Sequence, residues 1–148
     1  MKGKMFDLTE KTAIVTGAGR GIGKAIALGL AEVGADIGLV ARTTSELEAV
    51  AEQIQALGRR AVPITSDLTM TEGIQPLVEE LTGQMGGIDI LVNNAGINIP
   101  QDSIDVTVDA WDQIMDINLK ASFFMAQAAG SARAGKLTTA MDCLLNLT

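Results

Sequence analysis

The sequence predicts an α/β protein whose parallel sheet is covered by helices on both faces. Short apolar runs alternate four times with longer segments in which apolar residues recur at helical spacing. Such runs are typical of strands buried on both faces, and their alternation with helices favours right-handed parallel crossovers. A glycine-dense turn joins the first strand to the first helix. We therefore expect a doubly wound sheet.

Composition indicates one domain over residues 1–148. The chain is 47% hydrophobic and 20% charged, with a formal net charge of −7, which disfavours nucleic acid and anionic membranes as partners. It has no histidine, so we expect no metal site. One cysteine, no membrane-length apolar run and no signal-like N-terminus lead us to expect a cytoplasmic protein.

Two strand-and-helix units make up the first half of the expected fold. Residues 12–16 form the first strand, and Gly34 ends the helix that follows. Residues 37–41 form the second strand, and Thr43 and Glu46 have the spacing of a capping box. The apolar positions expected to face the core are Ile22, Ala25, Ile26, Leu30 and Val33, followed by Leu47, Val50, Ala51, Ile54 and Leu57.

The second half repeats this pattern. Residues 61–65 form a third strand, which Pro63 places at a sheet edge, and a third helix has Pro76 in its first turn. Residues 88–92 form a fourth strand, and Thr107 caps a long helix. The apolar positions of these helices are Ile74, Leu77, Val78 and Leu81, then Trp111, Met115, Leu119, Ser122 and Ala126; we expect Trp111, Met115 and Phe123 in the core.

The glycine turn after the first strand is expected to bind phosphate. Backbone N–H groups and the helix dipole converge there, and glycines let the main chain approach an anion. Ile22 stands where the motif G-x-G-x-x-G needs its third glycine, so the pattern is instead G-x-x-x-G-x-G over Gly17, Gly21 and Gly23. Taken alone, this pattern also fits an ordinary tight turn.

Polar residues follow the other three strands at the same edge of the expected sheet. Arg42 follows the second strand, Asp67 the third and Asn94 the fourth. Ligands of such sheets bind at the carboxyl ends of the strands. The four placements together favour a dinucleotide over a tight turn.

The end of the second strand indicates which dinucleotide is bound. NAD sites place a carboxylate there to accept from the ribose 2′-hydroxyl. Here Ala41 and Arg42 occupy that end, whereas Asp36 lies at the other end of the strand. Arg20 and Arg42 would attract a 2′-phosphate, so NADP(H) is favoured over NAD(H). The alternative is that Arg42 is a solvated surface arginine.

These motifs resemble those of the short-chain dehydrogenase/reductase family. The matching segments, within about residues 6–129, are Thr16-Gly17-Ala18-Gly19-Arg20-Gly21-Ile22-Gly23, Asp67-Leu68, Asn93-Asn94-Ala95-Gly96 and Asn118. The resemblance implies a Rossmann-type fold, a nicotinamide cofactor and hydride transfer between carbonyls and alcohols. The chain is most similar to 3-oxoacyl-carrier-protein reductases and to sugar or sugar-acid dehydrogenases.

The resemblance also implies roles for individual residues. The cofactor-binding set is Gly17, Gly19, Arg20, Gly21, Ile22 and Gly23 for phosphate, Arg42, Asp67 and Leu68 for adenosine, and Asn94, Ala95 and Gly96 beside the ribose. Asn118 would support catalysis by holding the active-site helix and a water. The alternatives are a helix N-cap for Asp67, turn chemistry for Asn93 and Asn94, and a structural hydrogen bond for Asn118.

The family's general acid is a tyrosine, assisted by a serine and by a lysine four residues further on. The sequence contains no tyrosine, and Lys136 comes too early for that lysine. Residues 130–148 diverge from the family: either 143–148 form a fifth strand at which the fold is truncated, or the segment is unrelated sequence.

We therefore expect a truncated dinucleotide-binding domain that is inactive by itself. A small carbonyl or alcohol substrate is expected only in a full-length relative. The alternatives are a non-catalytic nucleotide- or partner-binding remnant and a non-functional fragment. The helix starting at Thr107 would expose an apolar face, so we expect self-association through it.

Overall fold

The computed structural model describes residues 6–133 and 144–146. Strands and helices alternate as the sequence predicts. The elements are β1 (Thr12–Thr16), α1 (Gly21–Glu32), β2 (Asp36–Ala41), α2 (Thr44–Ala56), β3 (Ala61–Thr65), the 3-10 turn η2 (Thr71–Gly73), α3 (Ile74–Met85), β4 (Ile90–Asn93), α4 (Val108–Met115), the π-helical segment η3 (Asp116–Lys120), α5 (Ala121–Arg133) and β5 (Leu144–Asn146).

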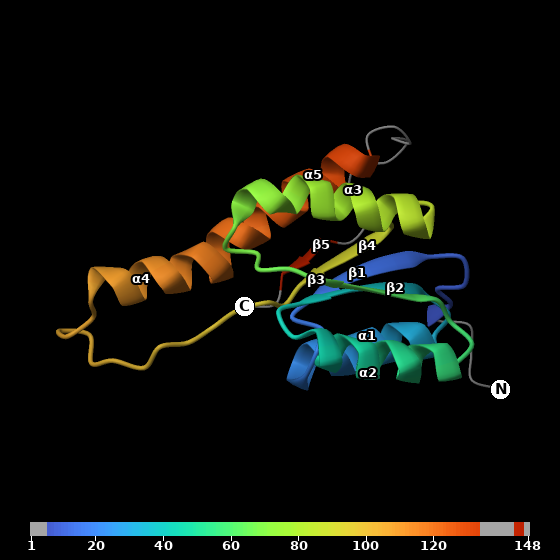
Figure 1. Ribbon diagram of the computed structural model, residues 1–148, viewed down its shortest axis with the longest axis horizontal. Coiled ribbons are helices and arrows are strands. Elements are labelled where there is room, and N and C mark those ends of the chain that lie inside the picture. Colours follow the sequence, from blue (N-terminus) through green and yellow to red (C-terminus); the bar gives the residue numbers. More distant parts are fainter. Residues whose placement is uncertain (1–5, 134–143, 147–148) are drawn as a thin grey trace.

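The strands form one parallel sheet in the order β3-β2-β1-β4-β5. Figure 1 shows α1 and α2 on one face of the sheet and α3 and α5 on the other. This confirms the doubly wound, Rossmann-type arrangement. The chain changes face after β3, and β4 then pairs with β1 on the side away from β2. The carboxyl ends of β1 and β4 therefore lie side by side at the switch point.

Pro63 lies on β3, at the edge of the sheet, as predicted from its missing N–H. At the other side, β5 pairs with β4 from Leu91↔Leu144 to Asn93↔Asn146, where one of the two interpretations of the tail placed a fifth strand. Residues 134–143 and 147–148 lie outside the described residues, and with them Lys136 and Cys143. Both interpretations of residues 130–148 therefore stay open.

Two apolar clusters fill the space between the sheet and its helices. One cluster lies under α1 and α2 and contains Leu47, Val50, Ala51 and Ile54 of α2, as predicted. The other lies under α3 and α5 and contains the predicted Ile74, Leu77, Val78 and Leu81. Pro76 is in the first turn of α3, where its missing N–H costs nothing.

The buried face predicted for α1 is right only in part, because Ile26 and Leu30 are half-buried against the cluster under α1 and α2. Gly23, Ala27 and Ala31 are the buried residues of this helix, whereas Ile22 is 70% exposed. The reason is close approach: small side chains allow α1 to lie directly against the sheet, so its larger residues stay at the periphery. The predicted capping box is also wrong in part, since Thr43 is at the N-cap of α2 but its side chain makes no capping hydrogen bond.

The core prediction also fails for the helix that follows Thr107. Thr107 caps it as predicted, with Oγ1 accepting from Ala110 N at 3.1 Å. However, Trp111 and Phe123 are 58% and 60% exposed, and Met115 is only half-buried. The buried side is formed by Ala121, Met125, Ala128 and Ala129, which pack towards α3. Two stripes at helical spacing compete here, and packing against α3 selects the one with smaller residues.

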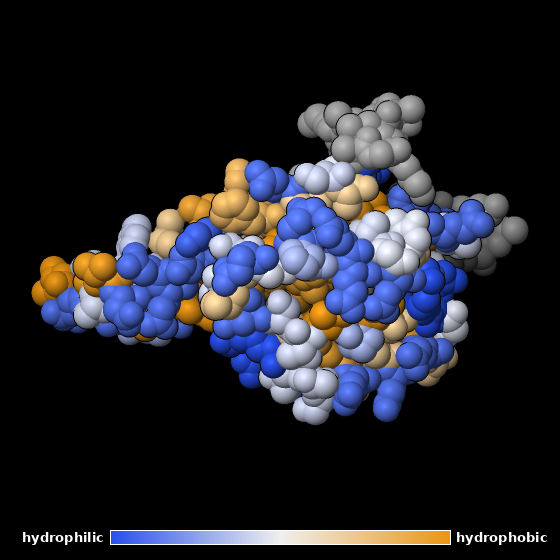
Figure 2. Space-filling view, turned by 45° about the horizontal axis from the view of Figure 1, so that its top comes forward, coloured by the Kyte–Doolittle hydropathy of each residue, from blue (hydrophilic) through white to orange (hydrophobic). Residues whose placement is uncertain are grey.

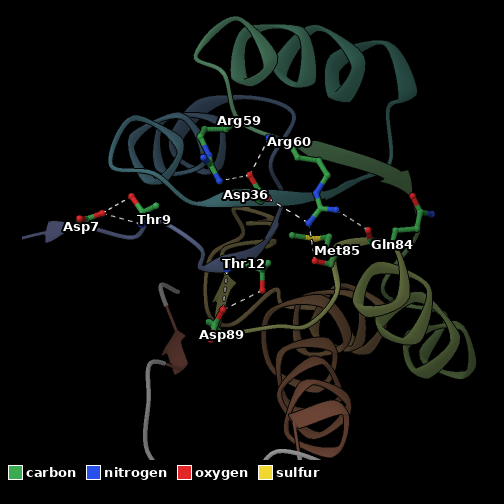
Figure 3. Close-up of polar contacts among 9 residues, drawn as sticks. All are labelled: Asp7, Thr9, Thr12, Asp36, Arg59, Arg60, Gln84, Met85 and Asp89. Atoms are coloured by element: carbon green, nitrogen blue, oxygen red, sulfur yellow. Dashed lines mark hydrogen bonds and ion pairs between the residues drawn. The ribbon is translucent and has the colours of Figure 1, made fainter.

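Charged residues hold the amino-terminal edge of the sheet together (Figure 3). Asp36, at the start of β2, accepts from Arg59 Nη2 at 2.7 Å and from Arg60 N at 3.0 Å. Arg60 also donates to the carbonyl oxygens of Gln84 and Met85, at the C-terminal end of α3. Asp36 therefore serves the scaffold at the edge opposite the predicted cofactor site.

Candidate cofactor-binding site

A cleft of about 650 Å³ opens at the carboxyl edge of the sheet. The glycine turn, the ends of β2 and β3, the loop after β4 and part of α4 and η3 surround it. Of the residues predicted to bind cofactor, the following line the cleft: Gly17, Gly19, Arg20, Gly21, Ile22, Arg42, Asp67, Leu68, Asn94, Ala95 and Gly96. Gly23 lies beneath the turn instead.

The turn requires glycine at two of these positions. Gly17 has a φ of +63°, and a Cβ atom there would lie 2.7 Å from Asn94 Nδ2. A Cβ atom on Gly23 would collide with the carbonyl oxygen of Gly17 and lie 2.5 Å from Asn94 Nδ2. The first turn of α1 therefore packs directly against the end of β1, and Gly23 acts through packing.

The N-terminus of α1 faces the cleft without a side-chain cap. Arg20 is at the N-cap and makes no capping hydrogen bond. Gly21 has a φ of +55° and open space within 4 Å of its would-be Cβ. Uncapped backbone N–H groups at a helix N-terminus bind anions well, so these residues fit a pyrophosphate.

Thr16 ties the end of β1 to the end of β4, and sequence reasoning gave it no role. Its side chain is buried, and Oγ1 accepts from the N–H groups of Asn94 and Ala95, both at 3.0 Å. Asn94 Nδ2 returns hydrogen bonds to the carbonyl oxygens of Thr16 at 3.0 Å and Gly17 at 3.3 Å. Asn94 thus holds the glycine turn through contacts with a distant part of the chain. The alternative considered for it, local turn chemistry, does not account for these contacts.

Asn118 holds the loop after β4 from the opposite side. Its Oδ1 accepts from Ile97 N at 2.8 Å, and its Nδ2 donates to Ile97 O at 2.9 Å. It lies in the π-helical segment η3, and such segments often mark functional sites. Asn118 itself is absent from the lining of the cleft, while Gly96 and Ile97 belong to it. The structural hydrogen bond considered for Asn118 is therefore present.

Asp67 forms a turn with Thr69. Its Oδ1 accepts from Thr69 Oγ1 at 2.8 Å and from Thr69 N at 3.0 Å. These hydrogen bonds, and then the charge of Arg42, lower the pKa of Asp67. The N-cap alternative is wrong, because the following turn η2 begins at Thr71 with Met70 as its N-cap. Leu68 beside it is buried.

The structure adds lining residues that the sequence did not indicate. Gln113, Asp116 and Ile117 reach the cleft from α4 and η3, about twenty residues after β4. Glu46 reaches it from the first turn of α2. The sequence did not indicate the first three because they lie far along the chain from the strand ends. It did not indicate Glu46 because that residue was assigned to a capping box.

Within the described ranges, no helix has the length and apolarity needed to cross a membrane. The same residues contain no group of three or more histidine, cysteine, aspartate or glutamate side chains suited to a metal ion.

Residues 11–136 match the family model described as short chain dehydrogenase. The chain belongs to the short-chain dehydrogenase family. Two similar curated members are the 2-dehydro-3-deoxy-D-gluconate 5-dehydrogenase of Escherichia coli K12 and the short-chain dehydrogenase/reductase FrzI of a Cladobotryum species. The first is 44% identical over 124 residues, covering 84% of this chain and 48% of the relative. The second is 46% identical over 123 residues, covering 82% and 48%.

Solved structures of family members have the same fold as this chain. A putative short-chain alcohol dehydrogenase from Sinorhizobium meliloti superposes with a TM-score of 0.86 at 44% identity, over 89% of this chain and 52% of that one. A short chain dehydrogenase from Burkholderia cenocepacia, solved in complex with NADP, gives a TM-score of 0.81 at 40% identity, over 84% and 51%. The chain spans about half the length of the curated family members that it matches.

Proposed function

We propose that this chain binds NADP(H) in the cleft, as the dinucleotide-binding half of a dehydrogenase that interconverts carbonyls and alcohols. The observation that carries the proposal is the glycine cradle, where added Cβ atoms at Gly17 and Gly23 would collide with Asn94. The Burkholderia relative solved with NADP supports the class of cofactor. When bound, a nicotinamide cofactor supplies or accepts hydride.

The residues of the chain divide the binding between them. The uncapped start of α1 at Gly21 would hold the pyrophosphate. Asp67 and Leu68 would contact adenine, and the loop from Asn94 to Gly96 would lie beside the ribose. Arg20 and Arg42, both exposed on the rim, would attract a 2′-phosphate and so favour NADP(H) over NAD(H).

Reduction of a carbonyl also needs a proton donor. The chain contains no tyrosine, the residue expected in that role from the family resemblance. Loss of a general acid costs about 10²- to 10⁴-fold in rate. We therefore infer that this chain binds cofactor without measurable turnover. The Escherichia coli relative makes a sugar acid the first substrate class to test, for a full-length protein. The single cysteine of this chain is consistent with a cytoplasmic location.

Isothermal titration with NADPH and NADH tests the proposal. We expect NADPH to bind more tightly, and Arg42→Ala to weaken NADPH about tenfold while changing NADH little. Lys11→Ala, which removes one positive charge near Asp89 at the other edge, serves as the control. Equal affinities for the two cofactors, or an equal loss in the control, would contradict the preference. Turnover of a ketone or sugar acid would contradict the inferred inactivity.

We also propose that two copies of the chain associate through an exposed apolar stripe. The stripe consists of Val108, Trp111, Leu119 and Phe123. Figure 2 shows apolar patches among hydrophilic surface on the projecting end of the molecule, which α4 and the loop before it form in Figure 1. Asp112 lies towards one end of the stripe and Lys120 towards the other. Lys120 pairs with Asp116 of its own chain at 3.3 Å, and antiparallel, two-fold pairing would bring this ion pair towards Asp112 of the second copy.

Sedimentation velocity over a range of concentrations tests this association. Leu119→Glu should yield monomers at concentrations where the unchanged chain forms dimers, because the new charge would be buried in the interface. Leu57→Glu makes the same change at another exposed leucine, at the end of α2, and should leave the dimer intact. A monomeric unchanged chain would refute the proposal.

A further inference from the structure

Glu46 brings a carboxylate to the part of the cleft where the ribose 2′ position is expected. A Cβ atom placed on Gly19 would lie 2.8 Å from Glu46 Oε2 and 3.6 Å from the Cβ atom of Ala41. The Glu46 carboxylate therefore rests against the main chain of the glycine turn, next to the end of β2. All three residues line the cleft.

This placement changes the argument about cofactor choice. In dinucleotide sites of this fold, a carboxylate at the end of the second strand accepts from the ribose 2′-hydroxyl. Ala41 holds that sequence position here and has no polar side chain. The first turn of α2 carries Glu46 back to the same corner of the cleft, five positions further along the chain.

We propose that Glu46 determines cofactor specificity, by repelling a 2′-phosphate and accepting a hydrogen bond from a 2′-hydroxyl. This proposal rests on the proposed function. Glu46 opposes Arg20 and Arg42, which attract the phosphate. The preference for NADP(H) is consequently smaller than the two arginines alone would produce.

The charges around this corner support such a balance. Arg20 and Arg42 lie on the rim of the cleft and are exposed, and Glu46 lines the same cleft, half-buried against Gly19. Arg42 also acts on a second carboxylate, because its charge contributes to the lowered pKa of Asp67. Two cations and two carboxylates thus share this end of the cleft. Removing one carboxylate makes the electrostatic potential there more positive, which favours a bound phosphate.

Isothermal titration with adenosine 2′,5′-bisphosphate and 5′-AMP isolates the effect, since these probes differ only in the 2′-phosphate. The measured quantity is the ratio of their affinities in the full 148-residue chain. Glu46→Gln should raise this ratio about fivefold, the size expected for one charge removed near a phosphate at a solvated rim. Glu48→Gln makes the same change on an exposed position of α2 outside the cleft and should leave the ratio unchanged.

The outcomes separate this inference from the proposed function. If the unchanged chain binds the bisphosphate and Glu46→Gln leaves the ratio as it was, Glu46 is not a determinant and the proposed function stands. An equal rise in Glu48→Gln would reduce the effect to net charge and also overturn the inference. If neither the unchanged chain nor Glu46→Gln binds the bisphosphate, 5′-AMP or NADPH, both proposals fail.

Discussion

Both polar atoms of the Asn118 side chain bind the backbone of a single residue, Ile97. Oδ1 accepts from the N–H of Ile97 at 2.8 Å, and Nδ2 donates to its carbonyl oxygen at 2.9 Å. The amide thus pairs with the backbone of Ile97 as a neighbouring strand would, and it fixes the loop after β4 that lines the cleft. An amide side chain offers an acceptor oxygen and a donor nitrogen on the same carbon, as this pair of hydrogen bonds requires.

Asn118→Ala should therefore destabilise the protein by about 1–2 kcal/mol, because both backbone groups of Ile97 lose their partner in a half-buried place. Urea denaturation measures the loss. Asn98→Ala removes an exposed amide from the same loop and should change the free energy of unfolding by less than about 0.5 kcal/mol. Equal stability of the Asn118 variant and the unchanged chain would show that the clamp is dispensable.

Two glycines of α1 should respond oppositely to alanine. Gly23→Ala forces a methyl group against the Gly17 carbonyl and should cost about 3 kcal/mol or more. Gly29 has open space at its Cβ position, so Gly29→Ala should stabilise the protein by about 0.5–1 kcal/mol through helix propensity. Thermal melts followed by circular dichroism compare the two. Similar changes in both would mean that the turn is looser than described.

The hydroxyl of Thr16 should matter more than its methyl group. Thr16→Val leaves the N–H groups of Asn94 and Ala95 without their acceptor and should cost about 2–3 kcal/mol. Thr16→Ser keeps the hydroxyl and should cost about 1 kcal/mol, the value of one buried methyl group. Urea denaturation distinguishes them. A larger loss in the serine variant would assign the effect to packing.

The stability that the charge of Asp67 contributes should change with pH only in acid. Hydrogen bonds from Thr69, and then the charge of Arg42, lower the pKa of Asp67 from its ordinary value of 3.8. A lowered folded pKa contributes stability that is present above the unfolded value and is lost as pH falls through the folded value. Urea denaturation from about pH 5 to pH 3 should show a shallower decline for Asp67→Asn than for the unchanged chain.

Asp102→Asn removes the same charge from the exposed loop before α4 and is the control for that experiment. Its decline with pH should stay closer to that of the unchanged chain. Parallel declines in the unchanged chain and in Asp67→Asn would show that the turn with Thr69 does not favour the charged carboxylate.

Local patterns were sufficient where the chain itself limits the choices. Pro63 was placed on an edge strand because it cannot donate to a neighbour, and β3 is at the edge. Thr107 was placed at a helix start because its oxygen can accept from the first turn, and it does so. The glycine turn was located from its spacing, since few sequences place glycines this densely after an apolar strand.

Patterns failed where two surfaces of one helix compete. The helix after Thr107 has an apolar stripe with Trp111 and Phe123 and another with Ala121 and Met125. Periodicity favours the stripe with the larger residues, yet the stripe that packs against α3 and the sheet consists of Met125 and three alanines. The same preference for close approach explains why the prediction for α1 was right only in part: Gly23 and Ala27 are buried, and the predicted Ile26 and Leu30 are half-buried.

By itself, then, the sequence determined the order of strands and helices, the cradle at Gly17 to Gly23 and the edge at which a dinucleotide would bind. These follow from short-range physics: backbone restrictions, periodicity and the direction of parallel strands. Tertiary structure alone decided that Thr16 ties β1 to β4, that Asn118 clamps Ile97 and that Glu46 rests against Gly19. Each of these contacts joins segments whose distance and orientation are fixed only after the helices pack on the sheet.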